Sequence, residues 1–142
     1  MRPKPIPDGF TTVTPYLAVA EGDRMLRFLE AAFGAQVLRA HRRPDGTLGN
    51  AEVRVGTAMV MVGQVDDPAR ATRAMLYLYV ENVDAVFRAA IEAGGTSILE
   101  PVDQFYGDRS GGLTDPCGNE WWVATHVEDL SDAEIERRAQ GR

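Results

Sequence analysis

Two strand-like runs sixty-one residues apart decide the fold: Thr14-Pro15-Tyr16-Leu17-Ala18-Val19 and Met75-Leu76-Tyr77-Leu78-Tyr79-Val80. Each run leads into a segment with helical spacing of apolar residues, and each of these segments ends at a glycine, where helices commonly stop. The correspondence continues at the same offset on both sides, with the pairs Val19/Val80, Asp23/Asp84, Gly34/Gly95 and Leu38/Leu99. Matches held over this length indicate an internal repeat.

Each repeat reads as strand, helix and three further strands. Turn residues separate the later strands, as at Pro44-Asp45-Gly46 and at Asp115-Pro116-Cys117-Gly118. The sequence therefore predicts an α+β fold of two tandem βαβββ units, with curved mixed sheets around a cleft. We expect one domain over residues 1–142, divided as repeat 1 at about 11–63, a linker at about 64–72, repeat 2 at about 73–126, and a C-terminal helix at about 131–140.

Composition narrows the class of protein. The chain has 142 residues, of which 44% are hydrophobic and 25% charged, which is ordinary for a globular domain. Its net charge of -6 and scattered basic residues argue against nucleic-acid binding. We expect no membrane association, because no apolar run reaches the roughly 18–20 residues that span a bilayer. A single cysteine, Cys117, excludes an intramolecular disulfide, and we expect a cytoplasmic protein.

Short segments within the two repeats resemble those of a known protein family. The segments that carry the resemblance are Thr14-Pro15-Tyr16-Leu17, Tyr106-Gly107-Asp108-Arg109, Asp115-Pro116-Cys117-Gly118-Asn119 and the run from Trp121 to His126. With these segments the chain resembles the vicinal oxygen chelate superfamily of glyoxalases, bleomycin-resistance proteins and extradiol dioxygenases, and within it the PhnB-like branch. The resemblance implies a cleft between the two units, and in the enzymes of the superfamily a divalent metal held there by His, Glu or Gln.

The metal positions that the resemblance implies carry unsuitable side chains in this sequence. They fall on Thr14, near Val60 or Val62, on Met75 and on Trp122. None of these is a good ligand for a hard or borderline divalent ion. We therefore expect no cofactor at the usual site, while a divalent metal held in another way stays open.

Alternation along the strands predicts what lines the cleft instead. If Trp122 faces inward, so do the other residues at even positions of its strand, and the same reasoning applies to the first and fifth strands. A polar group beside the turn at Gly107 could add further contacts. The predicted ligand-binding residues are Tyr16, Met75, Tyr77, Tyr79, Tyr106, Arg109, Glu120 and Trp122. Such a surface can stack on a flat organic molecule, and Glu120 could hold a cationic group.

Two functions follow as hypotheses. The first is a metal-free protein that binds a small organic ligand, aromatic or cationic, in the aromatic cleft. The alternative is a lyase, isomerase or dioxygenase that uses a non-standard metal site, drawn from Glu52, Glu120 and His126, or a metal-free general base at His126. Glu120 and His126 are thus the catalytic candidates. We also expect a homodimer, since the resembled family often pairs its halves across a two-fold axis.

Overall fold

The two repeats form two separate four-stranded sheets. The structure, a computed structural model, describes residues 2–141. The first unit comprises β1 (Tyr16–Val19), α1 (Gly22–Phe33), β2 (Gln36–Arg42), β3 (Leu48–Val55) and β4 (Ala58–Gln64), and a short 3-10 helix, η1 (Pro68–Arg70), lies in the linker. The second unit comprises β5 (Met75–Tyr79), α2 (Val83–Glu92), β6 (Thr96–Asp103), β7 (Asp108–Thr114) and β8 (Glu120–His126), followed by α3 (Asp132–Gln140). This confirms the two predicted βαβββ units and the C-terminal helix.

The sheets have the same topology, with strand orders β1-β4-β3-β2 and β5-β8-β7-β6. In each, the first strand pairs in parallel with the fourth, and the other neighbours are antiparallel. Tyr16 lies opposite Met61, and Tyr77 lies opposite Trp122, so the offset of sixty-one residues holds in these strands. The metal-ligand position that the resemblance places near Val60 or Val62, in the fourth strand, therefore corresponds to Met61, on the face of the sheet that points away from α1.

Local sequence explains where the helices begin and end. Gly34 ends α1 in the left-handed conformation at φ 65°, which glycine adopts without steric cost. The side chain of Asn82 accepts a hydrogen bond from the Ala85 N–H at the start of α2. Ser131 accepts one from the Glu134 N–H at the start of α3.

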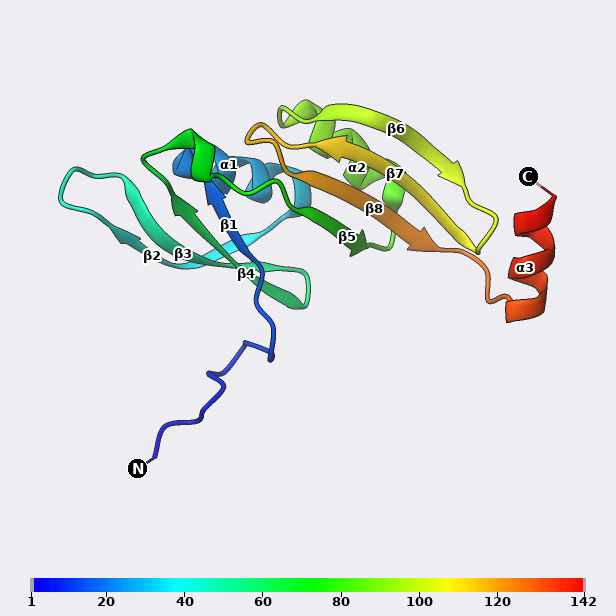
Figure 1. The fold of residues 1–142 in the computed structure, drawn as a ribbon, viewed down its shortest axis with the longest axis horizontal. Coiled ribbons are helices and arrows are strands. Elements are labelled where there is room, and N and C mark those ends of the chain that lie inside the picture. Colours follow the sequence, from blue (N-terminus) through cyan, green and yellow to red (C-terminus); the bar gives the residue numbers. More distant parts are fainter. Residues whose placement is uncertain (1, 142) are drawn as a thin grey trace.

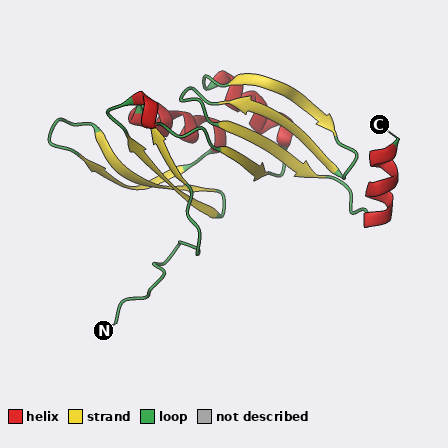
Figure 2. Cartoon of the chain, in the orientation of Figure 1, coloured by secondary structure: helices red, strands yellow, loops and turns green. Residues whose placement is uncertain are grey.

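The hydrophobic core lies between the sheets and the first two helices. Helix α1 packs on the first sheet, α2 packs on the second, and the two helices contact each other, which joins the units. The largest fully buried side chains include Trp121 and Phe28, which come from different units. No side chain of α3 is buried, and α3 stands apart at one end of the molecule (Figure 2).

The arrangement of the sheets differs from the expected cleft. The two sheets lie side by side along the long axis of the molecule (Figure 1), and no strand of one is hydrogen-bonded to a strand of the other. The face of each sheet that points away from its helix, here called the open face, is therefore not enclosed by the other sheet within one chain. Among residues 2–141, no helix is both long and apolar enough to cross a membrane.

Candidate functional site

The open face of the second sheet carries most of the predicted ligand-binding residues. Met75, Tyr77 and Tyr79 project from β5 and are 67%, 46% and 60% exposed. The next strand, β8, contributes Glu120 and Trp122 to the same face, because these residues lie beside Met75 and Tyr77 in register. The intervening residues, such as Trp121 and Val123, are buried under the helices. The predicted alternation is confirmed on both strands.

A glycine lets the Trp122 ring lie flat on this face. A Cβ atom added to Gly112 of β7 would stand 2.7–2.8 Å from three atoms of the Trp122 ring. The ring therefore covers the backbone of the neighbouring strand, and any side chain at Gly112 would displace it. The Trp122 Nε1–H donates to Glu120 Oε1 at 3.3 Å. Indole, phenols and a carboxylate thus share one solvent-exposed surface.

Asp108 organises the end of this surface. The hydroxyls of Tyr77 and Tyr79 each donate to Asp108 Oδ2 at 2.9 Å, and His126 Nδ1 lies 2.9 Å from Asp108 Oδ1. His126 Nε2 lies 2.8 Å from Asp129 Oδ1. Because each ring nitrogen faces a carboxylate, both nitrogens must carry hydrogen for both bonds to form, so this geometry favours the imidazolium.

The electrostatics of the cluster agree with that geometry. Hydrogen bonds to Asp108 and then to Asp129 raise the pKa of His126 above its ordinary value. Burial acts to raise the pKa of Asp108, but its hydrogen bonds with His126, Tyr79 and Tyr77 outweigh burial and leave that pKa lowered. Burial and hydrogen bonds with Tyr106 and Asp108 raise the pKa of Tyr77 well above its usual range. At neutral pH the cluster therefore holds ionised Asp108 and neutral phenols.

Two predicted residues lie differently from the rest. Arg109 faces α2, where its guanidinium bonds Asp84 at 3.0 Å and Asp103 at 3.3 Å, so it is not on the open face. Tyr16 lies on the open face of the first sheet, where its hydroxyl lies over Gly63 of β4. Tyr106 joins the cluster through Tyr77. Asp108 belongs to the polar group considered beside the turn at Gly107, but neither Asp108 nor Asp129 was among the predicted ligand-binding residues. The signal available was that Asp108 begins the strand antiparallel to the one that ends at His126.

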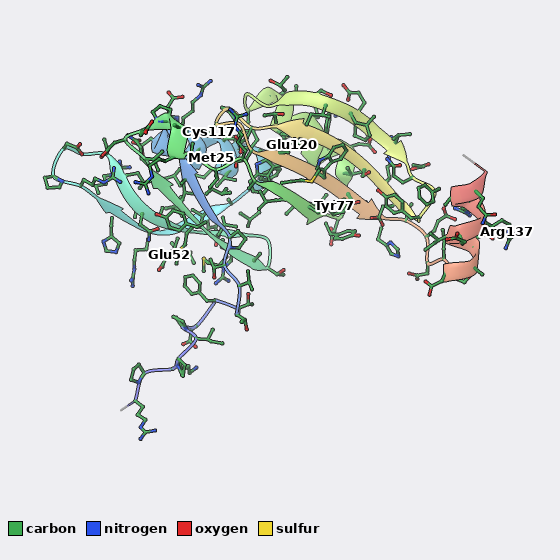
Figure 3. The ribbon with its side chains drawn as sticks, in the orientation of Figure 1. Met25, Glu52, Tyr77, Cys117, Glu120 and Arg137 are labelled. Atoms are coloured by element: carbon green, nitrogen blue, oxygen red, sulfur yellow. The ribbon has the colours of Figure 1, made fainter. Side chains whose placement is uncertain are left out.

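The structure does not bring the candidate catalytic residues together. Glu120 and His126 occupy opposite ends of the seven-residue strand β8, and six rises of about 3.3 Å separate them by about 20 Å. Glu52 lies on the first sheet, away from Glu120 (Figure 3), and its carboxylate is 3.9 Å from Arg39. Among the described residues of one chain, Glu52, Glu120 and His126 therefore do not form a single three-donor site.

The positions that the family resemblance assigns to metal ligands do not fit a divalent ion either. Thr14 lies against the first sheet beside Glu52 and Met61, while Met75 and Trp122 lie on the second sheet. These hydroxyl, thioether and indole groups are poor donors for nickel, zinc or iron(II). Within the described part of the chain, no three His, Cys, Asp or Glu side chains are grouped so that they could hold a metal.

Paired βαβββ units that form mixed sheets define a known class of fold. Residues 10–123 match the sequence profile of the Glyoxalase/Bleomycin resistance protein/Dioxygenase superfamily, and the chain belongs to this superfamily. It is 31% identical over 135 residues to the Mycobacterium bovis protein Mb0911c, covering 87% of this chain and 89% of that one.

Solved structures share the fold at lower identity. TioX from Micromonospora sp. ML1 superposes with a TM-score of 0.71 and 24% identity, over 82% of this chain and 99% of TioX. The PhnB protein from Bacillus cereus gives a TM-score of 0.66 and 17% identity, over 81% and 99% of the two chains. These likenesses concern the fold, and they confirm the predicted fold class.

Proposed function

We propose that this protein binds a small aromatic organic cation on the open face of its second sheet. The observation that carries the proposal is the exposure of Met75, Tyr77 and Tyr79 beside the flat Trp122 ring. Exposed aromatic side chains gathered on one face are typical of ligand-binding or interaction surfaces. Their π faces attract cations, and the Glu120 carboxylate adds a negative charge beside the indole.

The charge of the second repeat favours the same ligand class. Residues 73–126 contain three basic and eight acidic residues, a net charge of -5. At the polar end of the face, the two phenol oxygens already donate their hydrogens to Asp108, so each offers only lone pairs to a ligand. Both ends of the surface thus present acceptors, which suit ammonium or amidinium groups.

A planar probe tests the proposal. We would titrate the protein with 9-aminoacridine, which is cationic at neutral pH, and with acridine, which is mostly uncharged there, by isothermal titration calorimetry. We expect saturable binding of 9-aminoacridine, weakened in Trp122→Ala, and a preference for the cation that Glu120→Gln removes. Equal affinity for the two probes in the wild-type protein would contradict the cationic ligand class, and no binding of either would contradict the site.

We further propose that a second copy of the chain completes this site. A flat open face buries one side of a ligand, whereas small-molecule sites usually bury 70–90% of the ligand surface. The first repeat, residues 11–63, has six basic and five acidic residues, a net charge of +1, which complements the -5 of the second repeat. Arg39 and Arg54 stand on the open face of the first sheet, because they share the side of Glu52 and Met59.

Sedimentation equilibrium tests the dimer. We expect a homodimer at micromolar concentration whose dissociation increases with salt, because charge attraction between exposed groups is screened. Arg54→Glu should weaken the dimer, while Arg88→Glu on α2, away from both open faces, is the matched control. A monomer at all concentrations would refute the pairing.

His126 supports a second candidate function, a metal-free acid–base enzyme. A buried carboxylate, Asp108, holds Nδ1, while Nε2 faces only the fully exposed Asp129. A ligand that displaced Asp129 would meet the Nε2–H, which is the arrangement a general acid requires. If a ligand from the probe series is turned over, His126→Asn should abolish turnover with little change in binding; turnover retained in that variant would contradict the role.

A further inference from the structure

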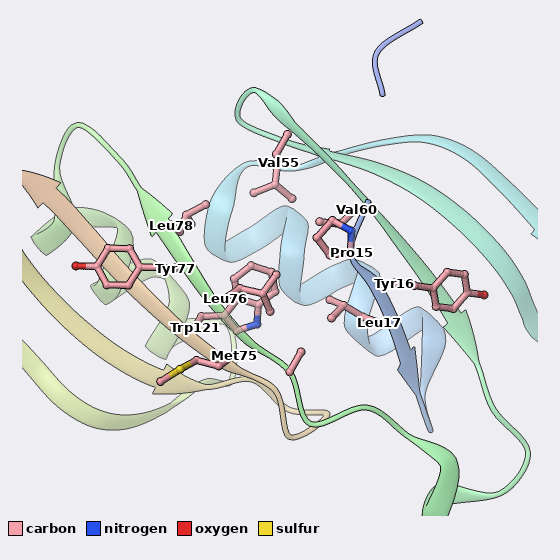
Figure 4. Close-up of a pocket in the computed structure, with 12 residues that line it drawn as sticks. Pro15, Tyr16, Leu17, Val55, Val60, Met75, Leu76, Tyr77, Leu78 and Trp121 are labelled. Atoms are coloured by element: carbon pink, nitrogen blue, oxygen red, sulfur yellow. The ribbon is translucent and has the colours of Figure 1, made fainter. Parts of the chain in front are cut away.

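A second apolar space lies between the two units. A cavity of about 480 Å³ separates β1 from β5 (Figure 4). The first unit lines it with residues such as Leu17 and Val60, and the second with Leu76, Leu78 and Trp121. These side chains point to the helix side of their sheets, so the cavity is distinct from the open face, although Met75 and Tyr77 also reach its rim. Among residues 2–141, no charged side chain lines the cavity.

The internal repeat shows that this space is an uncovered part of the core. Leu78 in β5 and Val80, directly after that strand, occupy the same positions as Leu17 and Val19 of β1, sixty-one residues earlier. Leu17 and Val19 are 0% exposed, whereas Leu78 and Val80 remain only half-buried. A smaller space of about 320 Å³ continues along the same edge, between Val80 and Phe33. These apolar side chains pack against the core, but they are less completely buried than their counterparts in the first unit.

The cavity also offers unpaired backbone groups. β5 is an edge strand that pairs only with β8. The backbone of Ala74 and Val80 bonds β8, through Glu120 N–H to Ala74 O and Val80 N–H to Ala124 O, each at 2.8–2.9 Å. By alternation, the N–H and C=O groups of Tyr77 point the other way, towards the cavity. An uncharged ligand with one amide or carbonyl group could pair with them.

We propose that this cavity between the two units, here called the seam cavity, is a second ligand site. It would select a neutral and largely apolar molecule with at most one or two uncharged hydrogen-bonding groups. Its volume lies within the range of small-molecule sites, and its lining of apolar side chains with a few backbone donors and acceptors is typical of them. An ionised ligand would lose its hydration there without gaining a charged partner. The cavity lies on the other side of β5 from the proposed cation-binding face, although Met75 and Tyr77 border both.

The two adjacent tryptophans allow the sites to be observed separately. Trp121 lines the seam cavity, with its Nε1–H bonded to Asp115 Oδ2 at 2.8 Å, and Trp122 lies on the opposite side of β8. In Trp122→Phe, the remaining tryptophan emission comes from Trp121 alone. The neutral dye N-phenyl-1-naphthylamine absorbs where tryptophan emits, so a dye bound in the cavity would quench Trp121.

The test is a titration of Trp122→Phe with this dye. We expect saturable quenching at one dye per chain, and at least a tenfold loss of affinity when Ala58→Phe fills the cavity. Ala74→Leu, from the opposite wall, provides a second filling variant if the first does not fold, and circular dichroism checks folding. Glu120→Gln is the control and should leave dye binding unchanged.

Three results would overturn the seam site: no saturable quenching, equal affinity in a folded filling variant, or displacement of the dye by 9-aminoacridine in simple competition. The last result would mean that one site takes both probes. If the wild-type protein failed to bind 9-aminoacridine while dye binding persisted, that result would instead refute the open-face proposal and leave the seam site supported.

Discussion

Replacement of Asp108 by Asn should destabilise the protein by about 2–3 kcal/mol. The carboxylate is 4% exposed and makes three hydrogen bonds of 2.9 Å, with Tyr77, Tyr79 and His126. Hydrogen bonds to a charged group contribute roughly 1.5–3 kcal/mol each. The amide of Asn keeps one acceptor oxygen but presents an NH₂ group in place of the other, so Asp108→Asn loses one or two of these bonds. The predicted decrease of about 2–3 kcal/mol in the free energy of unfolding corresponds to the loss of about one such hydrogen bond.

Urea unfolding monitored by tryptophan fluorescence at pH 6 measures this cost. Asp129→Asn is the matched control, because Asp129 also contacts His126 but is fully exposed, and it should leave the free energy of unfolding nearly unchanged. An NMR titration of the His126 ring should show its pKa falling towards 6.5 in Asp108→Asn. Equal stability of the two variants, or an unchanged His126 pKa, would refute the view that Asp108 organises the cluster.

Four further predictions concern the open face, Cys117, helix α3 and His126. Gly112→Ala should lift the Trp122 ring and weaken 9-aminoacridine binding roughly tenfold, about 1.4 kcal/mol by calorimetry; unchanged affinity would contradict the flat-ring site. Burial raises the pKa of Cys117 to about 11, so iodoacetamide should alkylate it at pH 8 about two orders of magnitude more slowly than a free thiol, as mass spectrometry can follow. Ser131→Ala should cost α3 about 1 kcal/mol, seen as lost helical circular dichroism without a change in the melting temperature of the sheets. The pKa of His126 is raised in the folded state. The contribution of His126 to the free energy of unfolding should therefore be complete below pH 6.5 and be lost as the pH rises through the raised pKa. Urea unfolding of His126→Asn should not show this pH dependence.

The sequence predicted the fold because its signals were local and repeated. Glycine at the helix ends, Ser131 before the last helix and the two-residue alternation of β5 and β8 each depend on nearby residues. The alternation alone placed Trp122 and Tyr77 on one face. These features need no knowledge of how the two units pack.

The site was harder to predict because it depends on contacts between distant residues. Arg109 follows Asp108 directly and was grouped with the ligand residues, but alternation turns it towards Asp84 on α2. The bonds of Asp108 to Tyr77 and His126 join three strands, whose order the sequence does not state. The seam cavity depends on how the two units pack against each other. The sequence pattern therefore indicated only that Trp121 is a core residue.

Methionine methyl NMR tests the central proposal, ligand binding on the open face of the second sheet, most directly. The Met75 side chain is 67% exposed on that face, whereas Met25 is fully buried in the core. Addition of 9-aminoacridine should shift the Met75 methyl resonance through the ring current of the bound probe and leave that of Met25 in place. A Met75 resonance that stays unmoved while calorimetry records binding would place the ligand elsewhere and contradict the proposal.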